Sequence, residues 1–214
     1  MDRLFNNLQH LDLFTFLYVL IIMLVYFVAK RLTVEQIKKL LVRNVDLKHS
    51  LFRQINNDTC INTILDKLLV DLHGDRIYIF QYHNGGSNIV GIPFLRCTNT
   101  HERCQLGIEP HINLYQNLPL AMYGFRHELI AQGMMITISD LELIKESDKS
   151  SYNLMRSQNI KSLYIKGLFS LDNTPIGFIG LDYIHDQKEL TSHQIKEFEL
   201  GVQKISGCLE GSHE

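Results

Sequence analysis

Residues 13–29 (LFTFLYVLIIMLVYFVA) contain no charged side chain and are followed at once by Lys30 and Arg31. At about 1.5 Å of rise per residue, a helix of this length spans roughly 26 Å, close to the ~30 Å hydrocarbon core of a bilayer. The basic residues follow the apolar run and no small-x-small site is present, which is unlike a cleaved signal peptide. The sequence therefore predicts one transmembrane helix, and the alternative is a buried helix of a soluble domain.

The predicted membrane anchor has apolar side chains along its length and two basic ones at its end, which can reach the headgroups. These residues are Leu13, Phe16, Leu20, Ile21, Leu24, Phe27, Lys30 and Arg31. Residues 1–12 are amphipathic and are expected either to lie in the membrane interface or to extend the span.

Basic residues are concentrated after the apolar run. Lys30, Arg31, Lys38, Lys39 and Arg43 follow it, whereas Arg3 before it is offset by acidic neighbours. Because Lys and Arg are retained on the cytoplasmic side, the part after residue 30 is predicted to be cytoplasmic, at an inner or cytoplasmic membrane. The apolar run makes the lipid bilayer an expected partner. Because the net charge is −2 and no basic patch is present, we expect no nucleic acid as a partner.

Residues 33–72 contain no proline or glycine and have apolar residues at helical spacing. Residues 30–58 are predicted to be a stalk helix whose apolar seam supports a homodimer or higher oligomer. Asn57, Asp58 or Thr59 can cap a following helix, in which Ile61 to Leu72 form an apolar stripe. Gly74 is the expected left-handed stop of that helix.

The remainder reads as strands and helices in the order of an α+β domain over residues 59–214. A strand is expected at 77–82, closed by the turn-forming residues 83–86 (HNGG), and a second strand at 89–100. Helices follow at about 120–132 and 148–158, with a short strand at 134–138 between them. Two clear strands at 161–171 and 176–184 precede a last helix that opens with the capping box Thr191 and Gln194.

The segments RIYIFQYHNGG (76–86) and SLYIKGLFSLDNTPIGFIGLDYIH (162–185), with a closing helix, resemble a GAF domain, a sensor fold related to PAS domains. The resemblance implies an N-terminal transmembrane and stalk helix followed by an antiparallel sheet of about six strands with flanking helices. It also implies terminal helices that pair across a dimer and a small-molecule pocket. The Asn-Lys-Phe-Asp-Glu signature of cyclic-nucleotide-binding members is absent, and no cysteine stands in a bilin-attachment context, so no cofactor is predicted.

The predicted ligand residues are apolar side chains with a few polar tips on the open side of the sheet and its lid. They are Phe80, Tyr82, His83, Asn84, Phe94 and Tyr123. The alternative interpretation is ordinary core packing beside a polar hairpin.

No catalytic or metal site is predicted. The sequence lacks nucleotide-binding, hydrolase and zinc-protease motifs. Cys97 and Cys104 are seven residues apart, which in one regular strand places them on opposite faces. Asp182 and His185 are expected at the surface. Cys60 and Cys208 fall on the first and last helices of the domain and are expected as neighbours, either as buried free thiols or as a bridge in an oxidising compartment.

We therefore expect a non-enzymatic, single-span membrane protein whose GAF-like domain is a sensor or a docking module for a regulatory protein partner. The alternative comes from the layout of one span, a stalk and a terminal domain, with Leu171, Asp172, Asn173, Gly177 and Tyr183 in the final hairpin. That layout resembles holins of the T-even phage type, which oligomerise in the host inner membrane to release endolysin and lyse the cell. This alternative implies a periplasmic domain.

Overall fold

The computed structural model describes residues 13–87, 93–120 and 126–210. The chain divides into two compact units, Met1–Phe52 and Arg53–Glu214. The predicted interfacial segment 1–12 lies outside the described residues. Helix α2 (Leu13–Asp71) is continuous, so the predicted boundaries at residues 29–30 and 58–59 correspond to no break in the helix.

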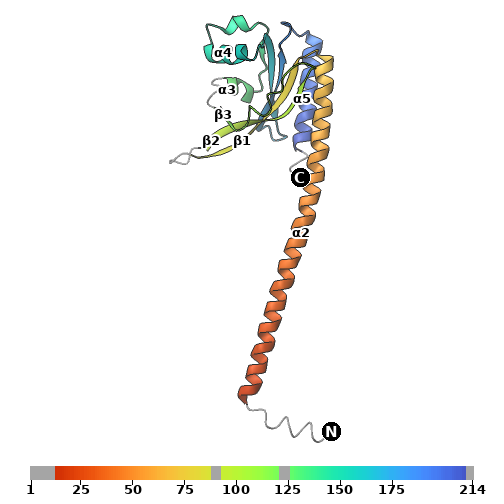
Figure 1. Cartoon of the computed structure of the whole chain (residues 1–214), viewed down its shortest axis with the longest axis vertical. Coiled ribbons are helices and arrows are strands. Elements are labelled where there is room, and N and C mark those ends of the chain that lie inside the picture. Colours follow the sequence, from red (N-terminus) through yellow and green to blue (C-terminus); the bar gives the residue numbers. More distant parts are fainter. Residues whose placement is uncertain (1–12, 88–92, 121–125, 211–214) are drawn as a thin grey trace. The chain divides into compact units, whose positions relative to one another are not determined.

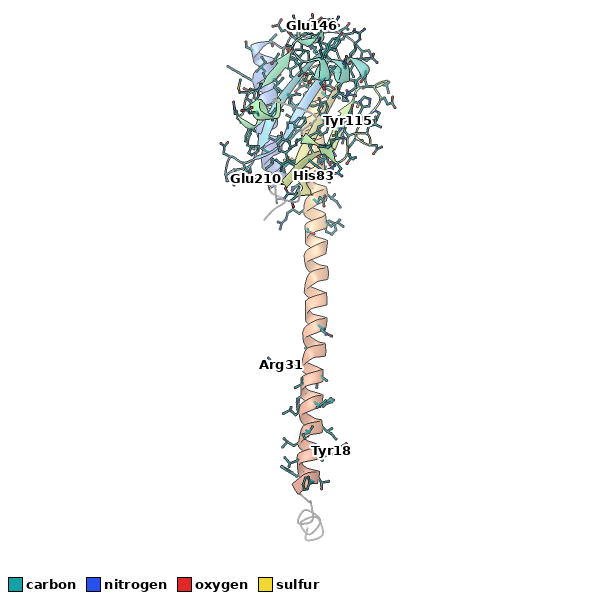
Figure 2. The ribbon with its side chains drawn as sticks, turned by 90° about the vertical axis from the view of Figure 1, so that its left-hand side faces the viewer. Tyr18, Arg31, His83, Tyr115, Glu146 and Glu210 are labelled. Carbon is teal, nitrogen blue, oxygen red and sulfur yellow. The ribbon has the colours of Figure 1, made fainter. Side chains whose placement is uncertain are left out.

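In the first unit, the segment Phe14–Arg31 of α2 is long and apolar enough to cross a membrane. Its side chains are exposed on every side, as in the stretch between Tyr18 and Arg31 in Figure 2. Exposing so large an apolar surface to water costs free energy, because removing apolar surface from water stabilises by about 25 cal/mol per Å². A bilayer would remove that cost, and the transmembrane role remains a prediction.

The last turns of α2 belong to the second unit and bury the predicted stripe, from Ile61 to Leu72, in its core. The expected cap at residues 57–59 is wrong: the helix runs through them, and the Thr59 hydroxyl donates to the Ile55 carbonyl over 2.8 Å. The helix ends in a Schellman motif, in which the amide of Gly74 donates to the carbonyl of Leu69.

The left-handed residue of this motif is His73, with φ of 51°, and not the predicted Gly74. Gly74 has a different role. A Cβ atom there would lie 2.3 Å from a methyl carbon of Leu181, so any larger residue would require this buried side chain to move.

The second unit contains one six-stranded antiparallel sheet in the order β3-β2-β1-β6-β5-β4. The strands are β1 (Arg76–Ser87), β2 (Pro93–Cys104), β3 (Leu118–Pro119), β4 (Ile136–Ile138), β5 (Ser162–Phe169) and β6 (Pro175–Tyr183). The predicted turn at residues 83–86 is wrong, because His83 pairs with Arg96 and Asn84 with Leu95, and β1 continues to Ser87. Pro93 stands at the first residue of β2, where a missing amide hydrogen is tolerated.

Each face of the sheet carries its own core. On one face, the end of α2 and α5 (Ser192–Glu210) lie side by side, and their apolar residues form one cluster with β1, β5 and β6 (Figure 1). On the other face, residues of α3 (Arg126–Ala131), η2 (Leu141–Ile144) and α4 (Lys149–Ser157) contribute to a second cluster with Phe80 and Phe178. This second side positions the site described below.

Most of the predicted elements after residue 130 are confirmed. Gly133, with φ of 76°, follows α3, and Asp148 caps α4 through the amide of Ser151. The capping box at the start of α5 is present, since the amide of Gln194 donates to the Thr191 hydroxyl and the Thr191 amide donates to the Gln194 side chain. The expected helix at 120–132 is described only from Arg126.

Candidate ligand cavity

A cavity of about 90 Å³ lies between the second face of the sheet and helix α4. The strands supply both polar and apolar side chains to it, and α3 and α4 line it on the side away from the sheet. Its lining residues are Arg76, Tyr78, Phe80, Asn99, Glu102, His111, Tyr115, Ile130, Ser151, Leu154, Met155, Gln158, Ile160, Leu163, Ile165 and Phe178.

A β-bulge at Thr100 builds the polar end of the cavity. Ile79 pairs with His101, whereas its neighbour Phe80 pairs with Asn99, so Thr100 has no partner on β1. Side chains of a regular strand alternate between the two faces of the sheet, so residues three positions apart point to opposite faces. One inserted residue between them places both side chains on the same face. Asn99 and Glu102 therefore both face the cavity, and the amide nitrogen of Asn99 donates to a Glu102 carboxylate oxygen over 3.3 Å.

The same bulge overturns an expectation about two cysteines. Cys97 pairs with Tyr82 and Cys104 with Arg76, so both lie on the cavity-side face of β2 rather than on opposite faces. Neither contributes to the lining of the cavity. Among the described residues, no cluster of three or more His, Cys, Asp or Glu side chains is arranged to hold a metal ion.

Arg76 is the centre of a buried charge cluster and is 2% exposed. Its Nη2 donates to Asp182 Oδ2 over 2.7 Å and to Gln158 Oε1 over 3.0 Å. Its Nε lies 3.8 Å from Glu102 Oε1. The hydroxyl of Tyr78 donates to the second oxygen of Asp182 over 3.1 Å. These partners satisfy a charge that would otherwise be very costly to bury.

His111 completes the cluster in its neutral form. Its Nδ1 lies 2.6 Å from Nη1 of Arg76, and a guanidinium can only donate, so Nδ1 accepts and the proton is on Nε2. The backbone amide of His111 donates to both carboxylate oxygens of Glu102, over 3.1 and 3.0 Å.

The cluster carries more negative than positive charge, because two carboxylates share one guanidinium. Burial raises the pKa of the Asp182 carboxyl, and the neighbouring Arg76 only partly opposes that rise. A positive charge or additional N–H donors in the cavity would relieve this excess. The prediction that Asp182 lies at the surface is wrong, since its side chain is fully buried. His185 lies outside the cluster and pairs with Asp75.

One buried acceptor among the described residues has no hydrogen-bond partner at this site. It is Oδ1 of Asn99, a residue that is 2% exposed. Reversing the amide would bring its oxygen against the Glu102 carboxylate, so the donor faces Glu102 and the acceptor stays unpaired. An unsatisfied buried acceptor costs about 1–3 kcal/mol, which a donor supplied by a ligand or by water would recover.

The apolar end of the cavity is formed around two stacked aromatic rings. Phe80 and Phe178 lie with ring centroids 4.9 Å apart and planes inclined by 7°. The ring of Tyr115 lies 6.1 Å from Phe80. A cavity of about 90 Å³ has room for a few ordered waters or for a small, compact ligand. The arrangement fits a compact ligand with an apolar body and one or more N–H donors.

Among the predicted ligand residues whose side chains the structure describes, Phe80 alone lines this cavity. Tyr82 borders a separate surface groove beside Leu171, and His83 Nε2 contacts the Thr98 hydroxyl over 2.9 Å. His83 lies apart from the cavity residue Tyr115 in Figure 2. Asn84 is exposed.

The other two predicted ligand residues are less fully described. Phe94 belongs to β2, and Tyr123 lies outside the described residues.

The second unit has a GAF-like α+β fold, a curled antiparallel six-stranded sheet with flanking helices. Its structural neighbours are GAF domains. The phycoerythrobilin-bound GAF domain of a cyanobacterial phytochrome matches with a TM-score of 0.57 and 14% identity, over 78% of this chain and 94% of that one. The GAF domain of PixJ from Thermosynechococcus elongatus matches with a TM-score of 0.56 and 14% identity, over 74% and 87%.

A third neighbour is the GAF-domain region of a protein named as a membrane protein, from Geobacter sulfurreducens. It matches with a TM-score of 0.57 and 11% identity, over 75% of this chain and 97% of that one. No protein-family model and no curated protein sequence matches the chain. At these identities the likeness establishes the fold, and function has to be argued from the site.

The residues of the cavity do not fit a bilin such as the one bound in the phytochrome domain. A linear tetrapyrrole has four rings, which is more than a cavity of about 90 Å³ encloses. No cysteine is among the described residues that line the cavity, so the site offers no thiol for covalent attachment there.

Proposed function

We propose that this chain is a non-enzymatic, membrane-anchored regulator whose GAF-like unit binds a small ligand in the cavity beside α4. The ligand class is a single-ring compound that carries N–H donors and is neutral or cationic. The observation that carries the proposal is the unpaired Oδ1 of Asn99 at the edge of a cluster with excess negative charge. A cavity filled only by apolar packing has no need of a buried acceptor.

The lining supports binding rather than catalysis. Every ionisable group of the charge cluster is held by a partner within the protein, so none is presented as a nucleophile or a free base. The stacked phenylalanines supply a flat apolar wall, and the polar groups converge at one end, as in small-molecule binding sites.

Membrane anchoring is the second part of the proposal. The apolar segment Phe14–Arg31 supports it by length and composition. Helix α2 contains this segment and also contributes its last turns to the core of the GAF-like unit. We propose that the GAF-like unit acts on a regulatory protein partner or on a membrane assembly. We also propose that the chain self-associates through the stalk and terminal helices.

The ligand proposal is tested with two substitutions on α4 in the full-length chain in detergent micelles. Ser151→Phe fills the cavity from the helix side, whereas Ser150→Phe adds the same ring at an exposed neighbouring position. A panel of single-ring heteroaromatic amines is screened by thermal shift. We expect stabilisation by at least one compound in the wild type and in Ser150→Phe, and its loss in Ser151→Phe. Equal shifts in all three proteins, or none in any, would overturn the proposal.

The orientation is tested by a reporter fused after Glu214 that is active on only one side of the membrane. A cytoplasmic reporter agrees with the excess of Lys and Arg after the apolar run. A periplasmic reporter would contradict this orientation and favour the holin-type alternative.

A further inference from the structure

Two cysteine thiols of the GAF-like unit are in direct contact on the side of the sheet opposite the cavity. Sγ of Cys60, on α2, lies 2.6 Å from Sγ of Cys208, on α5, although 148 positions separate them in the chain. Both cysteines are free thiols. A disulfide bond is about 2.05 Å long, so the two sulfur atoms need to approach by only about half an ångström to bond.

Packing on either side of the two cysteines holds the thiols together. Ile61, next to Cys60, and Leu209, next to Cys208, are both buried in the core cluster that joins α2 to α5. Further along the same contact, a Cβ atom at Gly201 would lie 2.5 Å from a methyl carbon of Leu68, so the helices approach closely. The sulfur–sulfur contact therefore lies within a closely packed helix pair.

We propose that Cys60 and Cys208 form a reversible disulfide that joins α2 covalently to α5, and that small-molecule disulfides such as oxidised glutathione are its oxidants. This site is independent of the ligand cavity, which lies on the other face of the sheet. The bond would fix the last turns of α2 against the final helix of the unit.

The chemistry balances as two successive exchange steps. The Cys60 thiolate attacks one sulfur of the small disulfide, forms a mixed disulfide and releases one small thiolate. The Cys208 thiolate then attacks the Cys60 sulfur of the mixed disulfide and releases the second small thiolate. The protein loses two protons and two electrons in total, and the small disulfide is reduced to two thiols.

Accessibility assigns the order of these steps. Cys60 is exposed and Cys208 is half-buried. Burial, together with the adjacent Cys60 thiol, raises the pKa of Cys208 to about 11, so Cys208 is protonated at neutral pH and is the poorer first nucleophile. Cys97 and Cys104 are likewise poorer first nucleophiles than the exposed Cys60, because burial raises the pKa of Cys97 to about 12 and that of Cys104 to about 11.

The test uses the full-length chain in detergent micelles, incubated with oxidised or reduced glutathione. Intact mass and peptide mapping should give a loss of two hydrogens and a Cys60–Cys208 cross-linked peptide. The bond closes a long loop, so the thermal midpoint should rise by roughly 5–10 °C on oxidation. Dithiothreitol should reverse both changes.

Three variants make the outcome specific. Cys208→Ser should retain a mixed disulfide on Cys60, Cys60→Ser should remove the thermal shift, and the control Cys104→Ser should behave as the wild type. Any of three results would overturn the proposal: a disulfide between two chains, mixed disulfides that persist on both cysteines of the wild type, or a thermal shift that survives Cys60→Ser.

Discussion

The side-chain amide of Asn99 donates to the carboxylate of Glu102 over 3.3 Å, although the two residues are three positions apart on one strand. In a regular strand that spacing would put them on opposite faces of the sheet. The bulge at Thr100 reverses the alternation, so both side chains face the cavity while His101 faces α2. One inserted residue thus creates the polar end of the candidate site.

Breaking the charge cluster should destabilise the protein strongly. Arg76→Met removes the guanidinium and leaves the buried carboxylates of Asp182 and Glu102 without their cation, which costs about 3–5 kcal/mol. The control is Arg103→Met, whose ion pair with Asp66 is solvent-exposed and worth about 1 kcal/mol or less. Chemical unfolding followed by near-ultraviolet circular dichroism of the tyrosines measures both losses. Equal losses would contradict the assigned role of Arg76.

The close pairing of β1 with β6 predicts that Gly177→Ala destabilises the protein, and an exposed glycine of α5 provides the control. A Cβ atom at Gly177 would lie 2.0 Å from the carbonyl oxygen of Phe80, so Gly177→Ala should cost about 1–3 kcal/mol. At Gly207, in α5, a Cβ atom meets no neighbour within 4 Å, so Gly207→Ala should stabilise by about 0.5–1 kcal/mol. Thermal midpoints in one buffer compare the two, and a stable Gly177→Ala protein would refute the pairing.

The contact between β2 and α2 predicts a pH dependence. Nε2 of His101 lies 3.2 Å from Asp58 Oδ1, and burial lowers the pKa of His101 below 6.5, aided by nearby Arg103 and opposed by Asp58. Between about pH 7 and the lowered pKa of the folded state, the unfolded chain binds more protons, so stability falls as the pH falls.

This dependence is isolated by substitution. His101→Gln should lose less stability than the wild type between pH 7 and pH 5, because Gln does not titrate. His193→Gln, at an exposed position of α5, should keep the wild-type slope. Denaturant midpoints measured across this range check both, and an unchanged slope in His101→Gln would contradict the burial argument.

Local patterns predicted the elements whose residues interact with near neighbours in sequence. The stripe from Ile61 to Leu72, the β5–β6 hairpin and the capping box at Thr191 depend on periodicity, β-branched content and a three-residue spacing. The turn at residues 83–86 failed although its composition is typical, because cross-strand pairing carries β1 on to Ser87. Pairing of this kind depends on residues that are distant in sequence.

The candidate site was largely missed for the same reason. Arg76, Glu102 and His111 are unremarkable in sequence, and only the fold brings them to one cavity. A partial signal was available in Asp182, a charged residue inside the apolar strand PIGFIGLDY. A charge in such a strand is buried and requires a partner, which predicts a cation on a neighbouring strand. The bulge at Thr100 has no comparable signal.

The central claim is that the cavity beside α4 binds a small ligand, and isoleucine methyl groups report on it directly. Ile130, Ile160 and Ile165 line the cavity, whereas Ile61 and Ile205 belong to the core on the opposite face. In a methyl-labelled full-length chain titrated with single-ring heteroaromatic amines, the account predicts saturable shifts at the first three and none at the other two. Shifts confined to Ile61 and Ile205, or absent at all five with every compound, would contradict it.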